Sequence, residues 1–540
     1  MPRKKIPTKA ELIQLQKLYK TDEKIAERLG NVTPQLVAYW RRKKNVPKYS
    51  FAKFSSEEIR ELWERFGDDY RCGLELGISK AAFYNWRRRY GFKEKPAFLK
   101  LEQLELNLGP SGGVPGRKKY TGCQTISQKI LADSSGLEQI EVGQTVEVEP
   151  DLAMSNDNAG EVLKIFSESG LNYVWNPNRI VIPLDYQSLP DNCRAAEVHQ
   201  SIRDFIRKQN IKYFYEVGEG NCHQIIVEKA HILPGQLAFG THEYSTSCGC
   251  LGAFGRGISI EEMATVWATG KLTMPVPATL KIIINGRMPK GICAKDVILF
   301  VAQKLGCNTA ADKAVEFYGT AVSQMSISER FTLTSQARDL GARAALVPFD
   351  SITRRYLMRR TNMPYRPALA DRDAVYEASY EFNIDQLVPQ IACPDAVDNI
   401  VPVAEREGIP VDQVVLGTDS NGRFDDLRVA ADIIKGKKVN PRVRFLIYPS
   451  SRSIYLEALK KGLIRAFIEA GAVVMSPGSN FCNGNHIGGL ASGEKCAATF
   501  NSNSEGPKGA DGAELFLVSP ATAAATAIKG AITDPSRYIK

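Results

Sequence analysis

The feature that most constrains the fold of this chain is a long alternation of short β-rich runs with helical stretches, which begins at Thr121. The segments IVIPLD, QLAFG, LKIIINGRM, VRFLIYP and AVVMSPGS have the β-branched and aliphatic composition of strands. Strands that alternate with helices over such a length predict an α/β protein with several layered subdomains. A chain of 540 residues also exceeds what one hydrophobic core holds, so we expect several domains.

The excess positive charge is confined to the first fifth of the chain. Residues 1–100 contain 24 Lys and Arg against 12 Asp and Glu, a net charge of +12, whereas the whole chain carries only +10. The remainder is therefore close to neutral, at −2. Such asymmetry is typical of a module that faces nucleic acid, joined to an uncharged body.

An internal repeat occupies this basic region. DEKIAERLGNVTPQLVAYWRRKKNVP starts at Asp22, and DDYRCGLELGISKAAFYNWRRRYGFK starts at Asp68. In each copy a short helix ends in Leu-Gly, a Thr or Ser then supplies an N-cap, and a second helix ends in Trp and a basic run. This plan resembles the helix-turn-helix units of transposases and phage proteins.

The second helix of such a motif enters the major groove, so this resemblance implies a set of DNA contacts. We expect base contacts from Thr33, Gln35, Tyr39, Lys80, Tyr84 and Asn85, and phosphate contacts from Arg41, Arg42, Arg87, Arg88 and Arg89. The alternative is a pair of helical hairpins whose basic ends are solvated or bind a protein.

Composition marks the domain boundaries and the compartment. A Gly- and Pro-rich segment without periodic pattern predicts a linker at residues 106–119, between a helix-turn-helix region at 1–105 and a large region at 120–540. No apolar stretch is long enough to span a bilayer, and no signal segment follows the N-terminal charges. We expect a cytoplasmic protein without membrane contact, whose 11 cysteines do not form a disulfide framework.

Ten motifs in one order carry a stronger resemblance over nearly all of the large region. They are DLAMSNDNAG, NRIVIPLDYQSLP, YEVGEGNCHQ, PGQLAFGTHEYSTSCGCLGAFGRGIS, KDVILFVAQKLG, GARAALVPFD, LGTDSNGRFDDLRVAADIIKG, SPGSNFCNG, GEKCAATFNSNSEG and LVSPATAAATA. This series resembles the aconitase superfamily, in particular the large subunits of 3-isopropylmalate dehydratase and homoaconitase.

The resemblance implies both a fold and a reaction. The fold is three α/β/α subdomains around a cleft, the third at roughly 400–540. The reaction is removal and re-addition of water on a hydroxy-di- or tricarboxylate, with a [4Fe–4S] cluster acting as Lewis acid. The base is supplied by a swivelling domain, which in these enzymes is a separate small subunit.

The positions that hold the family's cluster have mostly changed. The motif G-S-C-T-N corresponds to residues 417–421, where Asp419 replaces the cysteine. The motif P-G-C-x-x-C-x-G corresponds to residues 477–484, where Ser479 replaces one cysteine and Cys482 retains the other. Cluster irons need soft thiolates, so we predict that the cluster is lost. Alternatives are a single harder divalent ion on these three residues, or no metal and a packed Cys482.

The acid–base and anion-binding positions have changed as well. Family histidines correspond to Tyr186, Asn156 and Tyr244, and the aspartate that pairs with the family counterpart of His223 corresponds to His242. Asp185, His223 and Asp157 are retained, and Asp339 stands for a family glutamate. The arginines that grip substrate carboxylates correspond to Ser502 and Pro507, which leaves Lys508 nearby.

Two hypotheses follow from this pattern. The first is a divergent, cluster-free hydro-lyase or isomerase that acts on a hydroxycarboxylate with a small subunit. Its catalytic residues would be Asp185, His223, Tyr244 and Asp339, with Asn421, Ser502 and Lys508 toward the substrate. The second is a non-catalytic regulator, in which the old cleft binds a small carboxylate ligand and the helix-turn-helix pair binds DNA. Fold analogy does not decide between them.

Overall fold

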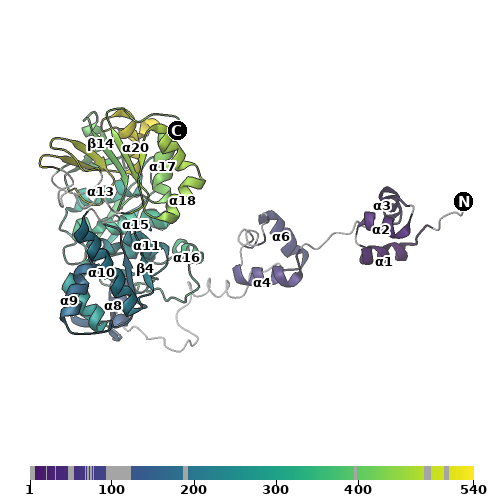
Figure 1. Cartoon of the computed structure of the whole chain (residues 1–540), viewed down its shortest axis with the longest axis horizontal. Coiled ribbons are helices and arrows are strands. Elements are labelled where there is room, and N and C mark those ends of the chain that lie inside the picture. The colour runs from purple at the N-terminus through teal and green to yellow at the C-terminus, as the bar shows by residue number, and fades with distance from the viewer. Residues whose placement is uncertain are drawn as a thin grey trace. The chain divides into compact units, whose positions relative to one another are not determined.

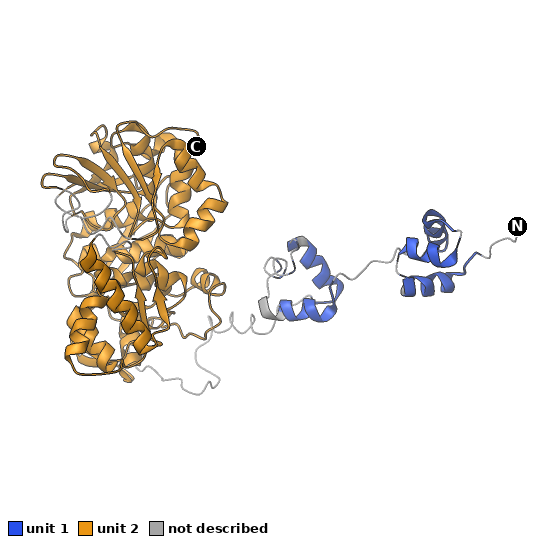
Figure 2. Ribbon diagram, viewed as in Figure 1, with its two compact units in different colours: residues 1–117 blue, residues 118–540 orange. Residues whose placement is uncertain are grey.

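The chain is described by a computed structural model in which it forms two compact units, residues 1–117 and 118–540 (Figure 2). The structure describes residues 6–539 apart from a set of gaps. These gaps are 20, 31, 47–53, 67–68, 70–71, 73–75, 77, 79, 93–122, 187–191, 395–397, 479–487 and 504–509. The predicted linker, Ser479, Cys482 and Lys508 therefore lie outside the described residues.

The first unit contains both copies of the sequence repeat, each with its own apolar core. Here each copy is taken together with the helix that precedes its repeat segment, so the first comprises α1 (Lys9–Tyr19), α2 (Asp22–Leu29) and α3 (Pro34–Lys43), and the second includes α4 (Ser56–Phe66) and α6 (Lys80–Arg89). Thr33 caps α3, as predicted, by accepting a hydrogen bond from the Leu36 amide at 3.3 Å. The apolar faces of the helices enclose Trp40 in the first copy and Trp63 in the second.

The second unit is α/β, as predicted, and begins with a parallel five-stranded sheet (Figure 1). Its order is β4 (Tyr213–Tyr215), β3 (Ile180–Pro183), β2 (Leu152–Met154), β5 (Leu237–Gly240), β6 (Phe254–Gly257). Alternate strand residues enter different cores, with Ile180 and Ile182 on one face and Val181 on the other. Both faces are thus buried, as in a three-layer α/β/α sandwich.

Helices cover the faces of this sheet. On one face Phe205 of α10 (Cys193–Gln209) lies 5.7 Å from Phe166 of α9 (Ala159–Glu168) and stacks at 5.4 Å on Trp267 of α12 (Ile260–Thr269). The other core contains Ile226 and Val227 of α11 (Cys222–Glu228). The helix α8 (Ile126–Ser135) and the two-stranded sheet of β1 (Thr145–Val148) and β7 (Leu272–Pro275) extend the first core.

Two further sheets complete the unit. The second is parallel, in the order β10 (Ala344–Leu346), β9 (Ala314–Tyr318), β8 (Thr279–Asn285), β11 (Ala378–Asn383). The third has the order β13 (Ile400–Pro402), β12 (Gln390–Ala392), β18 (Glu514–Val518), β17 (Lys495–Ala498), β14 (Gln413–Gly417), β15 (Arg444–Tyr448), β16 (Val473–Val474), and only the pairs of β12 are antiparallel. In the chain, the third sheet begins at Gln390.

The helices of these two sheets follow in the chain as α13 (Ala294–Leu305), α14 (Thr320–Gln324), α15 (Ile327–Gln336), η2 (Ala337–Leu340), α16 (Ser351–Leu357), η3 (Val403–Arg406), α17 (Phe424–Ile434), α18 (Arg452–Lys460), α19 (Leu463–Ala470), α20 (Pro520–Lys529) and η4 (Pro535–Tyr538). None of the helices in the described part of the chain is both long and apolar enough to cross a membrane.

A 3-10 segment, η1 (Glu243–Leu251), joins the first sheet to the second. Two glycines permit this contact, because a Cβ on Gly249 would lie 1.5 Å from the Ala345 carbonyl oxygen and one on Gly255 would lie 2.0 Å from the Ser245 carbonyl oxygen. Backbone therefore packs directly on backbone here, and the start of η1 is held rigidly at the edge of the first sheet.

Candidate active site

Three neighbouring parallel strands deliver the polar residues of the candidate site. Asn156 and Asp157 follow β2, Asp185 and Tyr186 follow β3, and His242 follows β5. Because β2 lies between β3 and β5, the carboxyl ends of all three strands meet at one edge of the sheet. This is the edge at which α/β proteins generally bind ligands.

At this edge two histidines and a tyrosine form a hydrogen-bonded chain. The Tyr186 hydroxyl lies 2.7 Å from His242 Nε2, and His242 Nδ1 lies 3.4 Å from His223 Nε2. The Tyr244 amide also donates to His242 Nδ1 at 3.4 Å. His242 therefore connects a phenol to a second imidazole, an arrangement that can pass a proton along the chain.

Both histidines are held in their neutral form. Burial lowers the pKa of His223 well below its ordinary value, and neighbouring His242 lowers it further. Burial also lowers the pKa of His242, an effect that Asp419 and Glu243 only partly offset. A neutral imidazole both accepts and donates a proton, which a protonated one does not.

The hydrogen-bonded chain of Tyr186, His242 and His223 borders a cavity of about 800 Å³, a size that suits a small metabolite. Tyr186 and His242 line this cavity together with Asn156 and Asp157. Arg194 and Lys164 also line it and could attract an anionic ligand.

Two retained aspartates hold the framework of the site. Asp157 Oδ2 accepts the amides of Asp185 at 3.0 Å and Tyr186 at 2.8 Å, and Asp157 Oδ1 lies 3.2 Å from His199 Nε2. Burial alone would raise the pKa of Asp157, but these hydrogen bonds outweigh it and lower the pKa. Asp185 Oδ2 accepts the Cys222 amide at 2.8 Å, so this predicted catalytic residue helps fix the start of α11 beside His223.

The other predicted site residues come from the second and third sheets. Asp419 is buried in the loop after β14 and is close enough to raise the pKa of His242. Asp339 accepts from Gln336 Nε2 at 3.3 Å. Asn421 is buried, and its amide donates to Thr332 Oγ1 at 3.1 Å and Asp426 Oδ1 at 3.0 Å, so this predicted substrate ligand bonds within the protein. Ser502 is buried as well.

The residues at the family's cluster positions do not fit a [4Fe–4S] cluster. Asp419 presents a carboxylate that accepts from Thr418 Oγ1 at 3.0 Å, and only Cys482 supplies sulfur at these positions. Burial raises the pKa of Cys248 on η1 to about 12, so this thiol is a poor source of thiolate. Across the part of the chain that the structure describes, no group of three or more His, Cys, Asp or Glu could hold a metal ion.

The candidate DNA-contacting residues divide into exposed and buried ones. Gln35, Tyr39, Arg42, Lys80, Asn85 and Arg88 are exposed. Arg41 instead forms a buried two-pronged ion pair with Asp22, at 3.1 and 3.0 Å, and Arg87 forms the equivalent pair with Asp69, at 2.7 and 3.0 Å. We therefore correct the expectation that Arg41 and Arg87 contact phosphates, since their guanidinium groups bind the interior of each copy.

The most relevant residues that the sequence-based site omits are Tyr186 and His242. The motifs placed both residues at family positions. There we interpreted them as replacements that had lost the family's acid–base groups, because neither matches the family residue. The signal that could have found them is chemical, since a tyrosine and a histidine at two linked positions can form a new hydrogen-bonded pair.

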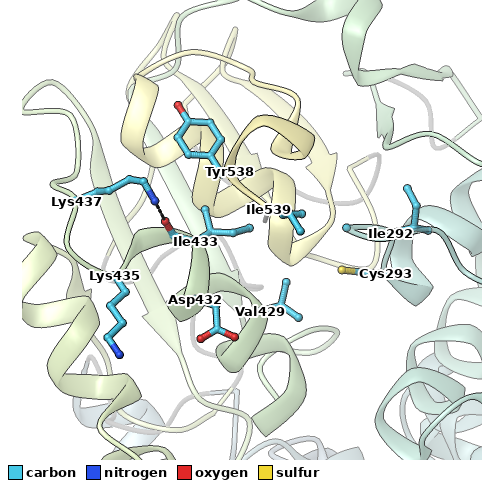
Figure 3. A pocket seen from close by; sticks show the side chains of 10 residues that line it. Ile292, Cys293, Val429, Asp432, Ile433, Lys435, Lys437, Tyr538 and Ile539 are labelled. Atoms are coloured by element: carbon cyan, nitrogen blue, oxygen red, sulfur yellow. Dashed lines mark hydrogen bonds between the residues drawn. The ribbon is translucent and has the colours of Figure 1, made fainter.

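A separate hollow of about 540 Å³ lies beside α17 and contains none of the predicted site residues (Figure 3). Lys437 donates to the Ile433 carbonyl at 2.5 Å, and its ammonium lies 5.4 Å from the centre of the Tyr538 ring. These contacts tie the C-terminal residues to α17, so we assign no ligand here.

The fold and the site define a class of protein, an α/β protein with a polar site at the carboxyl ends of the strands of its first sheet. Residues 182–530 match the family described as aconitase family (aconitate hydratase). The chain therefore belongs to the aconitase family.

Its relatives are large subunits. It is 42% identical over 417 residues to 3-isopropylmalate dehydratase large subunit 1 of Methanopyrus kandleri, covering 77% of this chain and 100% of that protein. It is 42% identical to the probable methanogen homoaconitase large subunit of Methanosarcina mazei, covering 72% and 98%. It is 36% identical to the 3-isopropylmalate dehydratase large subunit of Aquifex aeolicus, covering 77% and 98%. The chain is thus a large subunit of the 3-isopropylmalate dehydratase and homoaconitase type.

Proposed function

We propose that this chain is the large subunit of a hydro-lyase that acts on a small hydroxycarboxylate without an iron–sulfur cluster. The observation that carries this proposal is the Tyr186–His242–His223 chain, in which Tyr186 and His242 line the 800 Å³ cavity. The replaced cluster ligands support the cluster-free part, because Asp419 and Ser479 offer oxygen where iron needs sulfur.

The reaction is elimination of water, and the chain supplies its acid. A base takes the proton from the carbon next to the hydroxyl-bearing carbon, and the electrons of that C–H bond form the double bond. The C–O bond breaks while the Tyr186 hydroxyl gives its proton to the leaving oxygen, which departs as water. The phenolate regains a proton from His242 Nε2 as His242 Nδ1 accepts one from His223 Nε2, and solvent returns to this relay the proton that the base releases, so no net charge is left on the enzyme.

The base comes from a second chain. The curated relatives are named as large subunits, and a separate small subunit is the partner that such a name implies. We therefore place the base on a small subunit that closes over the cavity.

The test is an assay of the chain with the small subunit from the same genome. Both are purified without oxygen, and the unsaturated product of 3-isopropylmalate and of homocitrate is followed by ultraviolet absorbance. Tyr186→Phe removes the proposed acid, so we expect a rate loss of about 100-fold or more. Tyr215→Phe is the matched control, because Tyr215 makes a comparable bond to His231 Nε2 at 2.5 Å outside the site, and its rate should stay near wild type.

Iron analysis of the same preparation tests the cluster. The proposal expects turnover with far less than one iron per chain. Several irons per active chain, or equal rates for Tyr186→Phe and wild type, would overturn the cluster-free mechanism.

A second candidate function is DNA binding by the first unit, with the cavity as a sensor of a carboxylate ligand. Both copies of the repeat present an exposed aromatic ring with a cation near it, at 5.8 Å for Lys43 over Tyr39 and 5.7 Å for Arg88 over Tyr84. The two tyrosines are 53% and 40% exposed, so they do not serve as core residues of the two copies. Such a surface suits the bases and phosphates of DNA.

A further inference from the structure

Three arginines gather on the far side of the segment that carries His242. The backbone of His242 is extended, at φ −138° and ψ 138°, so neighbouring side chains point to opposite sides. His242 lines the 800 Å³ cavity, whereas Thr241 and Glu243 line a second cavity of about 420 Å³. Arg256, Arg338 and Arg343 line this second cavity, which we call the arginine pocket.

Arg256 is the member that forms no direct ion pair with an acid of the described residues. It lies on β6, and its Nη1 lies 3.3 Å from Met274 Sδ. Its Nε is buried and has no hydrogen-bond partner among the described residues. Burial lowers the pKa of Arg256, because a cation away from water is unfavourable, and the nearby charges of Glu262 and Asp312 only partly offset this effect.

The other two arginines are held by weak pairs. Arg338 pairs with Glu243, whose side chains are 30% and 51% exposed, and Arg343 pairs with Asp312 at 2.7 Å, where they are 51% and 78% exposed. Exposed pairs of this kind contribute little and exchange readily with another anion. Glu262 is the second acid of the pocket. Its carboxylate accepts a hydrogen bond from the Ser259 amide at 2.8 Å, so part of its hydrogen-bonding capacity is used within its own helix.

We propose that the arginine pocket is a binding site for a small oxyanion, the phosphate or carboxylate group of a metabolite. Guanidinium groups bind such groups through paired hydrogen bonds, and three of them from separate segments converge here. A cavity of this volume accepts a small metabolite. The site is distinct from the proposed active-site cavity and stands whether or not the chain is a hydro-lyase.

The pocket is also placed to affect His242. Arg338 is one of the groups that lower the pKa of His242. An anion bound to Arg338 would cancel part of that effect, so its binding and the protonation of His242 are linked.

Calorimetric titration of the full chain tests the site. The titrants are inorganic phosphate and malate, at an ionic strength held constant with sodium chloride. We expect saturable binding of at least one, and the stronger titrant identifies the group that the pocket prefers. Arg256→Gln should weaken it about tenfold or more, the loss expected for a charge-assisted hydrogen bond. Arg465→Gln is the control, because Arg465 is 80% exposed in a surface pair and should leave binding unchanged.

Circular dichroism of each variant establishes that it is folded, and Arg338→Gln serves as a second test if Arg256→Gln is not. No saturable binding of either titrant to wild type would overturn the proposal. Equal affinity in wild type and in a folded Arg256→Gln or Arg338→Gln variant would overturn it too, and neither result depends on catalytic turnover.

Discussion

At the scale of single residues, burial of histidine makes the stability of the second unit sensitive to acid. Burial lowers the pKa of His231 to about 4, whereas an unfolded histidine titrates near 6.5. The contribution of neutral His231 to the free energy of unfolding is complete above about pH 6.5. It is lost as the pH falls toward 4, because in this range the unfolded chain binds a proton on His231 and the folded chain does not. Buried acids such as Asp296, whose pKa burial raises to about 6, act in the opposite direction.

A comparison with His231→Gln isolates this one group. From pH 7 to pH 5 the wild type should lose about 2 kcal/mol of unfolding free energy relative to the variant, or about 1.4 kcal/mol for each pH unit below 6.5. Urea unfolding at both pH values measures this difference, and Asp296 cancels from it. A difference that does not change with pH would show that His231 titrates normally in the folded chain.

Residue chemistry could be predicted only where a motif marked the position. The motifs placed His223, Asp185 and Asp419 in one site, and the structure brings His223 and Asp419 close to His242. The arginine pocket could not be predicted, although Arg256 and Arg343 lie in two of the motifs, because these segments are some 80 residues apart and only the tertiary fold brings them together. Asn421 bonds to Thr332, whose proximity only the tertiary fold creates.

At the scale of elements, the two ion pairs Asp22–Arg41 and Asp69–Arg87 hold the helices of the repeat together. The same arginine of each pair also donates to a carbonyl five residues later, Val46 at 3.2 Å and Phe92 at 2.5 Å. Loss of one partner leaves a buried charge, which costs about 3–5 kcal/mol. A module of this size has little more stability than that in total.

We therefore expect Asp22→Asn to unfold the first copy of the repeat and leave the second intact, and Asp69→Asn to do the reverse. Hydrogen exchange measured on peptides of the full chain separates the two, and each variant is the control for the other. Retained protection of residues 22–43 in Asp22→Asn would contradict a structural role for this pair.

The elements themselves followed from the sequence more fully than these pairs did. IVIPLD, QLAFG, LKIIINGRM and VRFLIYP begin within one residue of the starts of β3, β5, β8 and β15, because buried strands need unbroken apolar runs. The basic run after Trp40 predicted a charged helix end but gave no sign that Arg41 faces inward. Its partner Asp22 lies 19 residues away, and periodicity alone does not pair them.

At the scale of the whole molecule, the uneven charge predicts which unit binds DNA. Residues 1–100 carry +12 and the remainder −2, so a phosphate backbone should attract the first unit alone. Fluorescence anisotropy with a random-sequence duplex should show binding by the full chain that weakens steeply with salt, and none by residues 118–540. Arg42→Glu with Arg88→Glu should weaken binding about tenfold or more and reduce the salt slope by about one per lost contact.

The control variant reverses the charges of Arg207 and Arg465, which are 73% and 80% exposed in the second unit. Equal binding by the full chain and by residues 118–540 would assign the affinity to the second unit. Unchanged binding in the Arg42 and Arg88 variant would leave the basic helix ends as solvated surface or as contacts for another protein.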